Sequence, residues 1–436
     1  MAHTKSAPLE GPAADTPHAE SLDPEDWEAF RAQAHELVDD LVARMATVRE
    51  RPVWRSVPDE SRDRISGPLP VNEGDLGDAL TTLREHILPY PTGNDHPRFW
   101  GWVMGNGTAD AMLAEMATAV MNPNAGGGDT AATVVEQQVV AWLAEVMGFP
   151  SDASGVLVNG ASMANFVALA VARHARAGFD VLAQGMQSAG HPPLTVYGSV
   201  ETHSCVPRAL QLLGFGLTHY RSIPVDASYG MDVDALRLQM ERDVAAGMRP
   251  VCVVGTVGTV NTGASDDIPA LAELARRHGA WLHVDGAFGA LARLSPALAD
   301  RVVGIDRADS LAFDLHKWGY LPYGVACVLV RDGTQHHDAF AYTVSYIATT
   351  TRGFLAPGTP FADRGVELSR RFNALKVWLS LRTHGTEKLG RIIARNVSDC
   401  RHLVRLIESH PELELLAPAP LNIVNFRYRG RGGDHG

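Results

Sequence analysis

The sequence is short of several features that mark familiar classes of protein. It has only four cysteines in 436 residues, Cys205, Cys252, Cys327 and Cys400, and no two of them form a CxxC pair. No run approaches the roughly 18 consecutive apolar residues of a membrane helix. Acidic residues outnumber basic ones by 50 to 38, which gives a formal net charge of -12. These absences argue against a disulfide framework, a cysteine zinc site, a membrane span and a nucleic-acid-binding face.

The remaining composition is that of an ordinary globular protein, with 45% apolar and 20% charged residues. Residues 1–22 are polar and rich in proline and alanine, without the apolar core of a secretory signal, and we expect them to form a disordered tail. With its cysteines reduced, the protein is expected in the cytoplasm. We expect it to act on a small molecule, with no nucleic acid, membrane or metal as a partner.

Residues 23–90 are predicted to form an N-terminal helical segment. Asp23 is the expected N-cap, with Pro24 at the first helical position. Apolar residues then recur at three- and four-residue steps and predict one amphipathic helix: Trp27, Phe30, Ala34, Leu37, Val38, Leu41 and Met45. The apolar stripe needs a partner surface, and we expect another subunit to provide it, which makes residues 23–90 a dimerisation segment; docking on the protein's own main domain is the alternative.

Residues 91–362 are predicted to form a large α/β domain, and residues 363–436 a small α+β C-terminal lobe. Short β-rich runs in the large domain alternate with helical stretches such as 162–176 and 268–279, which predicts a mostly parallel sheet covered by helices. The expected strands are GVLV from residue 155, LTVYGSV from 194, VCVVGTV from 251, WLHVD from 281, SLAFD from 310 and VACVLV from 325. Ligands bind at the carboxyl ends of such strands, so the residues that follow each run are candidate site residues.

The first candidate is the turn in LVNGASMANFVAL, where a strand passes through Ala161 into a helix that begins near Ser162. Free backbone N–H groups at a helix start, together with a serine hydroxyl, form an anion site. The turn matches neither a P-loop nor GxGxxG, so a nucleotide is not the expected anion. Ser162 as a simple N-cap is the competing interpretation.

The second candidate is Asp285, which closes the strand WLHVD. An acid in this position is costly to bury unless it meets a cation. His283 lies two residues before it and shares its face of the strand, so a metal pair is conceivable, but no third ligand is apparent. A protonated ring nitrogen is the better partner for Asp285.

The third candidate is Lys317, which stands between a histidine and a tryptophan in the otherwise apolar stretch FDLHKWGYLPYG. Apolar surroundings favour a neutral amine, which suits Schiff-base formation, although a lysine in a surface loop is the commoner case. His203, after the strand ending in GSV, offers a flat ring for stacking. A phosphate seat, an acid for a ring nitrogen, a lysine for an aldehyde and a stacking ring are together what pyridoxal 5'-phosphate requires.

With these residues in place, the sequence resembles the group II pyridoxal-phosphate decarboxylases, which act on aromatic amino acids, glutamate, histidine or cysteine sulfinate. The likeness runs from about Asp23 to the end, and its most specific pieces are HPRFWGWV, WLHVDGAFGA and HKW, with ELSRRFNALKVWLSLRTHG as a further block. The resemblance implies fold type I, the aspartate-aminotransferase-like fold with a mostly parallel seven-stranded sheet. It also implies a homodimer with shared active sites.

Carried onto this sequence, the resemblance gives each motif residue a role. Lys317 would bond the cofactor aldehyde, Asp285 would meet the pyridine nitrogen, and His203 would stack on the ring. The remaining expected cofactor contacts are Ala287 beneath the ring, Ala161, Ser162 and His316 near the phosphate, and Thr259 or the residue after it near the Asp285 side. The amino acid would displace Lys317, and CO2 would leave as its electrons flow into the ring.

The resemblance also predicts the residues that receive the substrate. A tyrosine on the loop AFAYTVSYIATTTRGF would return the proton to Cα, with Tyr346 as the choice and Tyr342 as the competitor. Such a tyrosine favours amine formation, whereas relatives with phenylalanine there tend to form an aldehyde. Trp100 and Trp102 would wall an aromatic side chain, and an aromatic L-amino acid is the expected substrate.

Two departures and two alternatives accompany this prediction. The glycine-rich MNPNAGGGDTAA stands where aromatic-specific relatives have bulkier residues, and the chain ends sooner after NIVNFRY than the family's C-terminal lobe implies. Another fold-type I reaction is the first alternative: an aminotransferase, with Arg370 and Arg371 holding a substrate carboxylate, or an aldehyde synthase. The second is a module that binds the cofactor without turnover, which the presence of both Lys317 and Asp285 disfavours.

Overall fold

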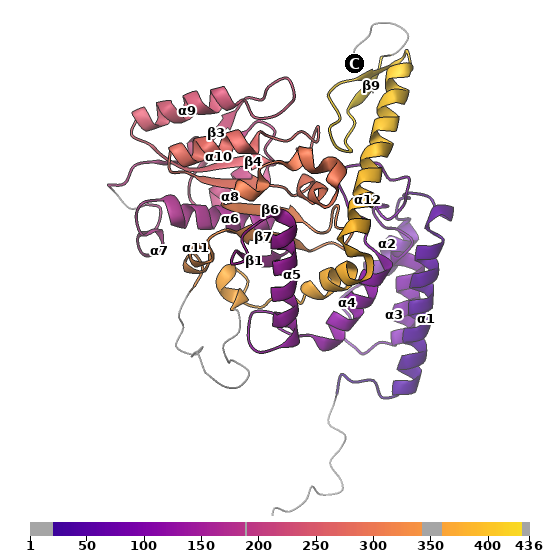
Figure 1. The fold of residues 1–436 in the computed structure, drawn as a ribbon. Coiled ribbons are helices and arrows are strands. Elements are labelled where there is room, and N and C mark those ends of the chain that lie inside the picture. The colour runs from indigo at the N-terminus through magenta and orange to yellow at the C-terminus, as the bar shows by residue number, and fades with distance from the viewer. Residues whose placement is uncertain (1–20, 188–189, 342–359, 430–436) are drawn as a thin grey trace, which may run out of the picture. The chain divides into compact units, whose positions relative to one another are not determined.

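The computed structural model describes residues 21–187, 190–341 and 360–429 (Figure 1). Its internal contacts divide the chain into two units, Met1–Gly93 and Asn94–Gly436. No helix among these described residues is long and apolar enough to cross a membrane.

The N-terminal unit is helical, as the apolar periodicity predicts. Its helices are α1 (Trp27–Ala46), η1 (Val48–Glu50), α2 (Asp59–Ile65), α3 (Leu76–Thr82) and the π-helical turn η2 (Leu83–Ile87). The predicted start of the first helix at Asp23 is wrong by three residues. Asp26 is the N-cap, because its carboxylate accepts hydrogen bonds from the backbone N–H groups of Glu28 and Ala29. Trp27 and Phe30 on α1 are exposed.

The second unit contains the predicted α/β domain. Its strands are β1 (Ser154–Val158), β2 (Leu194–Ser199), β3 (Tyr220–Ile223), β4 (Arg249–Thr256), β5 (Trp281–Asp285), β6 (Ser310–Asp314), β7 (Ala326–Val330), β8 (Leu413–Leu415) and β9 (Phe426–Tyr428). Its α-helices are α4 (Ala109–Met121), α5 (Ala131–Met147), α6 (Ala161–Arg176), α7 (Val181–Gln184), α8 (Cys205–Leu212), α9 (Val233–Ala245), α10 (Ile268–Arg277), α11 (Gly333–Asp338) and α12 (Ala374–Ser409). Its short 3-10 helices are η3 (Leu217–His219), η4 (Gly289–Leu294), η5 (Pro296–Val302), η6 (Ile305–Arg307) and η7 (Phe361–Arg364).

The main sheet has seven strands in the order β1-β7-β6-β5-β4-β2-β3, and only β7 runs antiparallel to its neighbours. This confirms the predicted mostly parallel sheet and all six predicted strands. The sequence analysis missed β3, a four-residue edge strand with one buried side chain, whose apolar signal is too weak to stand out.

Helices cover both faces of this sheet. Helix α6 crosses β4 to β7 on one face with α8 beside it, and α10 packs on β4 and β5 from the other face (Figure 1). Every residue of β1, β5, β6 and β7 is buried, which is why these strands are continuous apolar runs rather than alternating ones. The predicted helices at 162–176 and 268–279 are confirmed as α6 and α10.

The C-terminal part begins with α12, which packs on α4 and α5 in the same unit as the sheet. Gly385, at φ 68° and ψ 159°, breaks α12 into two helical stretches. This backbone conformation is essentially restricted to glycine. Strands β8 and β9 then pair antiparallel. The division of the chain at residue 363 into a separate small lobe stays a prediction.

Candidate active site

A cavity of about 220 Å³ lies at the carboxyl ends of the sheet strands. Asp285 ends β5, Thr256 ends β4, and the Lys317 segment follows β6. The described residues that line the cavity are Val103, Asn159, Gly160, Ala161, Ser162, Asn165, Glu201, His203, Cys205, Thr256, Gly258, Val260, Asp285, Ala287, Phe288, Asp314, His316 and Lys317. The strand ends that the sequence singled out therefore meet in one place, as expected for an open α/β sheet.

Lys317 faces this cavity with one-fifth of its side chain exposed. Its Nζ lies 3.1 Å from Oδ2 of Asp314, whose side chain is almost fully buried. The amine thus has a carboxylate partner, which the apolar character of the surrounding sequence did not indicate. An ion pair of this kind holds the lysine toward the cavity while it is in its charged form.

The same Asp314 carboxylate also reaches the start of α6. Its Oδ1 accepts a hydrogen bond of 2.7 Å from the backbone N–H of Ala161, the first residue of the helix. The helix start therefore binds the carboxylate of Asp314 in this structure, and its role as a phosphate seat stays a prediction. Ser162 is the second helical residue and not the N-cap, a position that Gly160 holds.

His316 lies beside this carboxylate and is nearly buried. Its Nδ1 donates to the carbonyl oxygen of Val325 at 3.1 Å, which leaves Nε2 free, and its ring packs on Tyr323 with the centroids 4.6 Å apart. Burial lowers the pKa of His316, and the nearby Asp314 opposes that shift. The histidine is therefore a neutral neighbour of the helix start at neutral pH.

Asp285 is held from two sides. Its Oδ1 accepts from the backbone N–H of Ala287 at 3.1 Å, and its Oδ2 accepts from the side-chain amide of Asn165 at 3.1 Å. His283, which is expected to share a face with Asp285, bonds the same asparagine: its Nε2 lies 2.6 Å from Oδ1 of Asn165. The described residues contain no group of three or more metal-ligating side chains. His283 is thus connected to Asp285 indirectly, through Asn165.

His203 and Ser162 lie on exposed parts of the cavity wall. The Nδ1 atom of His203 accepts a hydrogen bond of 3.2 Å from the backbone N–H of Cys205, which fixes the imidazole at the start of α8. Cys205 is buried beside Asn165, and burial raises its pKa to about 12. The thiol is therefore protonated and is no nucleophile, since thiolate is the reactive form.

Thr259 does not reach the cavity. It is buried, its Oγ1 lies 2.9 Å from Oγ1 of Thr262, and it accepts from the backbone N–H of Ala264. Val260, the alternative to Thr259, does line the cavity, and so does Thr256. Thr256 pairs with Asp285 in the β4–β5 register, and its buried Oγ1 has no hydrogen-bond partner within the described part of the chain. A buried hydroxyl without a partner is rare and indicates a missing ligand or water.

These residues fit pyridoxal 5'-phosphate. Lys317 can take the aldehyde, Asp285 retains free lone pairs toward the cavity for a protonated ring nitrogen, and the unpaired hydroxyl of Thr256 is available to a polar ring substituent. The start of α6 offers backbone N–H groups and Ser162 to the phosphate. One feature opposes the fit, because the carboxylate of Asp314 would have to leave the amide of Ala161 before a phosphate could bind there.

Comparison with known proteins decides the family. Residues 58–429 match the model of the pyridoxal-dependent decarboxylase conserved domain. The chain belongs to the pyridoxal-dependent decarboxylase family. It is a pyridoxal-phosphate-dependent amino-acid decarboxylase, and its cofactor is pyridoxal 5'-phosphate.

Relatives and solved structures agree with this assignment. The chain is 34% identical over 407 residues to an aromatic-L-amino-acid decarboxylase of Bacillus atrophaeus, covering 92% of this chain and 82% of the relative. It is 28% identical over 418 residues to a phenylacetaldehyde synthase of Arabidopsis thaliana, covering 93% and 84%. The crystal structure of Oryza sativa TDC with PLP and tryptamine superposes with a TM-score of 0.83 at 28% identity, covering 94% and 85%. The predicted fold type I is confirmed.

Four residues predicted to receive the substrate are not among the described residues that line this cavity. Trp100 and Trp102 are 80% and 83% exposed and do not line it, whereas the neighbouring Val103 does. Tyr346 and Tyr342 lie outside the described residues. The roles of these four side chains stay predictions.

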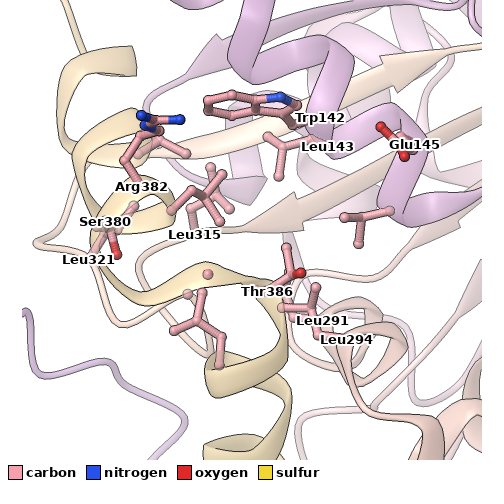
Figure 2. Close-up of a pocket in the computed structure, with 16 residues that line it drawn as sticks. Trp142, Leu143, Glu145, Leu291, Leu294, Leu315, Leu321, Ser380, Arg382 and Thr386 are labelled. Atoms are coloured by element: carbon pink, nitrogen blue, oxygen red, sulfur yellow. The ribbon is translucent and has the colours of Figure 1, made fainter.

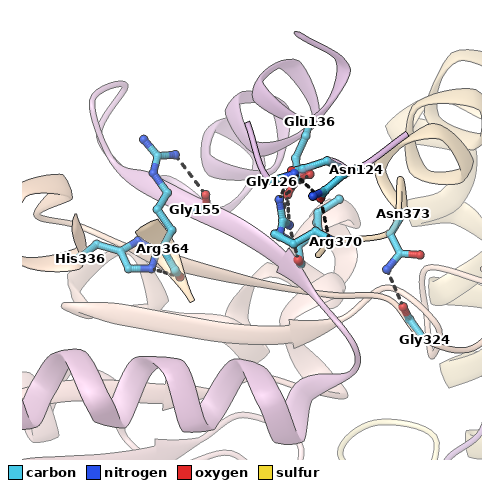
Figure 3. Close-up of polar contacts among 11 residues, drawn as sticks. Asn124, Gly126, Glu136, Gly155, Gly324, His336, Arg364, Arg370 and Asn373 are labelled. Atoms are coloured by element: carbon cyan, nitrogen blue, oxygen red, sulfur yellow. Dashed lines mark hydrogen bonds and ion pairs between the residues drawn. The ribbon is translucent and has the colours of Figure 1, made fainter. Parts of the chain in front are cut away.

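Arg370 is not available to a substrate carboxylate. It is 5% exposed, and its guanidinium binds both carboxylate oxygens of Glu136 at 2.5 and 3.2 Å and the carbonyl oxygens of Ala125 and Leu157 (Figure 3). Burial raises the pKa of Glu136, and the guanidinium opposes that shift. Arg371 pairs with Glu115 at the surface. The aminotransferase alternative required Arg370 to bind a substrate carboxylate. The guanidinium of Arg370 is already bonded to α5 and β1, which it connects to the start of the C-terminal part.

A second cavity of the decarboxylase, about 560 Å³, is larger but lacks the required chemistry (Figure 2). It lies between α5, η4, the 315–321 loop and the kinked part of α12, and its lining is mostly leucine and valine with Trp142. Glu145 and Arg382 are its ionisable groups among the described residues, and no lysine lines it. The smaller cavity is therefore the candidate active site.

Sequence reasoning missed several residues of this site, namely Asn159, Asn165, Glu201, Cys205, Thr256 and Asp314. Two of them carried a usable signal. Asp314 is the last residue of an apolar strand, as Asp285 is. Asn165 lies one helical turn after Ala161 and hence on the same face of α6. The others became visible only when distant strand ends were brought together.

Proposed function

We propose that this decarboxylase converts an aromatic L-amino acid to its amine and CO2. The charge of the active-site lining carries this proposal. Among the described lining residues, three carboxylates, Asp285, Asp314 and Glu201, accompany a single lysine that the cofactor engages. An acidic substrate side chain would meet repulsion there and no cation, whereas Val103, Val260 and Phe288 offer apolar surface. The decarboxylase of Bacillus atrophaeus and the rice structure with tryptamine, described above, point to the same substrate class.

The proposed roles of the chain's own residues follow from their positions. When bound, pyridoxal 5'-phosphate supplies an electron sink for the electron pair released with CO2. Lys317 would hold the cofactor through its aldehyde, and Asp285 would accept the hydrogen bond of a protonated ring nitrogen. His203 would cover one face of the ring, and the start of α6 with Ser162 would hold the phosphate. Tyr346, or its competitor Tyr342, would supply the proton to Cα.

The test is CO2 release from the cofactor-loaded protein across a panel of L-amino acids. Release with Trp, Tyr, Phe or Dopa is expected, and little with glutamate or cysteine sulfinate. Efficient turnover of an acidic amino acid would overturn the substrate proposal, because the lining would then have to contain a cation that the described residues do not supply. The absence of CO2 from every amino acid would contradict the aromatic assignment as well.

The product separates the amine reaction from the aldehyde alternative. We expect amine in a one-to-one ratio with CO2, and no ammonia or hydrogen peroxide. Tyr346→Phe is expected to divert part of the product to aldehyde, with Tyr342→Phe as the matched control on the same loop. Aldehyde as the main product of the unaltered protein would replace this proposal by an aldehyde synthase.

We also infer a homodimer with shared active sites, located in the cytoplasm. Support for the location comes from the four cysteines, which are all free and buried. Support for the dimer comes from the exposed Trp100 and Trp102, which could wall a substrate only in a site completed by a second copy. Sedimentation equilibrium tests the dimer, and Trp102→Ala tests the shared site through an increased KM for the aromatic substrate with little change in thermal stability.

A further inference from the structure

A continuous chain of hydrogen bonds runs through the buried sheet to the back of Asp285. The Nε1–H of Trp281 donates to Oγ of Ser310 at 2.8 Å, and this Oγ lies 2.9 Å from Nδ1 of His283. The Nε2 atom of His283 lies 2.6 Å from Oδ1 of Asn165, whose amide nitrogen donates to Asp285 at 3.1 Å. Ser310, His283 and Asn165 are completely buried.

The two ends of this chain fix the direction of every hydrogen bond in it. An indole N–H can only donate and a carboxylate can only accept. The amide nitrogen of Asn165 must therefore face Asp285, so its oxygen faces His283. The imidazole then carries its proton on Nε2 and accepts at Nδ1 from the hydroxyl of Ser310. Each donor points toward Asp285.

Two further observations support this assignment. Burial lowers the pKa of His283 to about 4, so the ring is neutral and holds a single proton to place. The second amide hydrogen of Asn165 is directed to Sγ of Cys205, 3.4 Å away, which agrees with the amide nitrogen on this side. Oδ1 of Asp285 accepts separately from Ala287. Both carboxylate oxygens thus receive a hydrogen bond from the protein and keep lone pairs for the cavity.

We propose that Asn165 and His283 are positioning residues that hold Asp285 as an oriented carboxylate. Hydrogen bonds to the charged form of an acid favour that form, and successive bonds in a buried chain strengthen one another. Asp285 can then keep a proton on the cofactor ring nitrogen although it is buried. The proposal rests on the proposed contact between Asp285 and that nitrogen, and it adds the residues that tune it.

The protein contains a second buried pair of a histidine and a serine, which is not connected to Asp285. His336 is as deeply buried as His283, and its Nδ1 also lies 2.9 Å from a serine hydroxyl, that of Ser154. Its Nε2, however, ends on the backbone carbonyl of Arg364 and reaches no carboxylate (Figure 3). Substitutions of His336 therefore reproduce the loss of a buried, serine-bonded histidine without touching Asp285.

The test compares Asn165→Leu, His283→Phe, His283→Gln and the control His336→Phe as cofactor-loaded proteins. The first readout, which needs no substrate, is the pH at which the visible absorption of the Lys317-bound cofactor changes. We expect Asn165→Leu and His283→Phe to shift this midpoint by about one pH unit or more, a tenfold change in the proton equilibrium. His283→Gln can still donate to Asn165 and should stay near the unaltered protein, as should His336→Phe.

The second readout separates kcat from KM on the best amino acid. Asn165→Leu is expected to lower kcat about tenfold or more with little change in KM, because the electron sink weakens while the substrate still binds. Ser310→Ala, two hydrogen bonds farther from Asp285 than Asn165, should have a smaller effect in the same direction. This milder variant keeps the test open if a larger substitution prevents folding.

Two results would overturn the proposal. One is a spectral midpoint in Asn165→Leu and His283→Phe equal to that of the unaltered protein, which would make the chain a purely structural element. The other is an equal shift in His336→Phe, which would assign the effect to lost stability. The failure of the proposed function would look different, since it concerns CO2 release by the unaltered protein and leaves the spectral comparison intact.

Discussion

The carboxylate of Asp314 joins Nζ of Lys317, 3.1 Å away, to the backbone N–H of Ala161 at the start of α6, 2.7 Å away. One side chain thus bridges the two places proposed for the cofactor, the seat of its aldehyde and the seat of its phosphate. We therefore expect cofactor loading to rearrange Asp314, and several measurable consequences follow from this and neighbouring contacts.

Asp314→Asn is expected to tighten cofactor binding by about tenfold, which corresponds to ~1.4 kcal/mol. The substitution removes a negative charge that competes with phosphate at the helix start, while an amide still accepts a hydrogen bond there. Fluorescence or absorbance titration of the cofactor-free protein measures the change. Asp232→Asn is the control, because the carboxylate of Asp232 also accepts from a backbone N–H at a helix start, that of α9, but lies outside the cavity lining. Weaker binding in Asp314→Asn would show that the carboxylate assists the phosphate.

Lys317→Ala is expected to abolish the visible absorption of the loaded protein and to lower CO2 release by three or more orders of magnitude, on the order of the loss seen when a covalent catalyst is removed. The reason is that Lys317 is the only lysine among the described residues of the cavity lining. Spectroscopy and a CO2 assay check both effects. Lys388→Ala, on the exposed part of α12, should leave both unchanged. An undiminished chromophore in Lys317→Ala would assign the aldehyde to another amine.

Arg370→Met is expected to lower the free energy of unfolding by about 3–5 kcal/mol, because it leaves Glu136 buried without its partner. The double variant Glu136→Gln with Arg370→Met should recover much of this loss, since no buried charge remains. Denaturant unfolding measures each free energy. Arg371→Met, which removes a half-exposed arginine paired with Glu115, should cost less than about 1 kcal/mol. Equal costs for the two arginines would contradict the structural role of Arg370.

The contribution of two buried histidines to the stability of the fold should decrease as the pH falls from about 6.5 toward 4, although Asp266, whose pKa burial raises to about 6, acts in the opposite direction. Burial lowers the pKa of His336 to about 3 and that of His283 to about 4, below the 6.5 of an exposed histidine. The unfolded chain therefore binds these protons first, so acid favours unfolding in that window, by about 1.4 kcal/mol for each pH unit and each histidine at most.

Denaturant unfolding at a series of pH values tests this dependence. His336→Gln should flatten the slope between pH 6.5 and 4, because the glutamine cannot take up a proton. His402→Gln on the exposed side of α12 should leave the slope unchanged. A slope in His336→Gln equal to that of the unaltered protein would mean that another group titrates on unfolding.

The sequence by itself predicted the sheet, its strand-end residues and the cofactor. Strands buried on both faces need continuous apolar runs, so β1, β4, β5, β6 and β7 were readable, and polar residues at or after the ends of such runs stood out. Asp285, Lys317, His203, Ala161 and Ser162 do line one cavity. This part of the site depends on local pattern and on the rule that strand ends converge, and both are properties of the sequence.

The tertiary structure decided which side chains are partners. Arg370, which the sequence offered as a ligand for a substrate carboxylate, is bonded to Glu136, 234 positions away along the chain. Thr259 bonds Thr262 in its own loop, whereas Thr256 lines the cavity. Asn165 and His283 come together from α6 and β5, 118 positions apart. Hydrogen bonds and ion pairs depend on distances of about 3 Å between atoms, and no local pattern of residues encodes such distances across the fold.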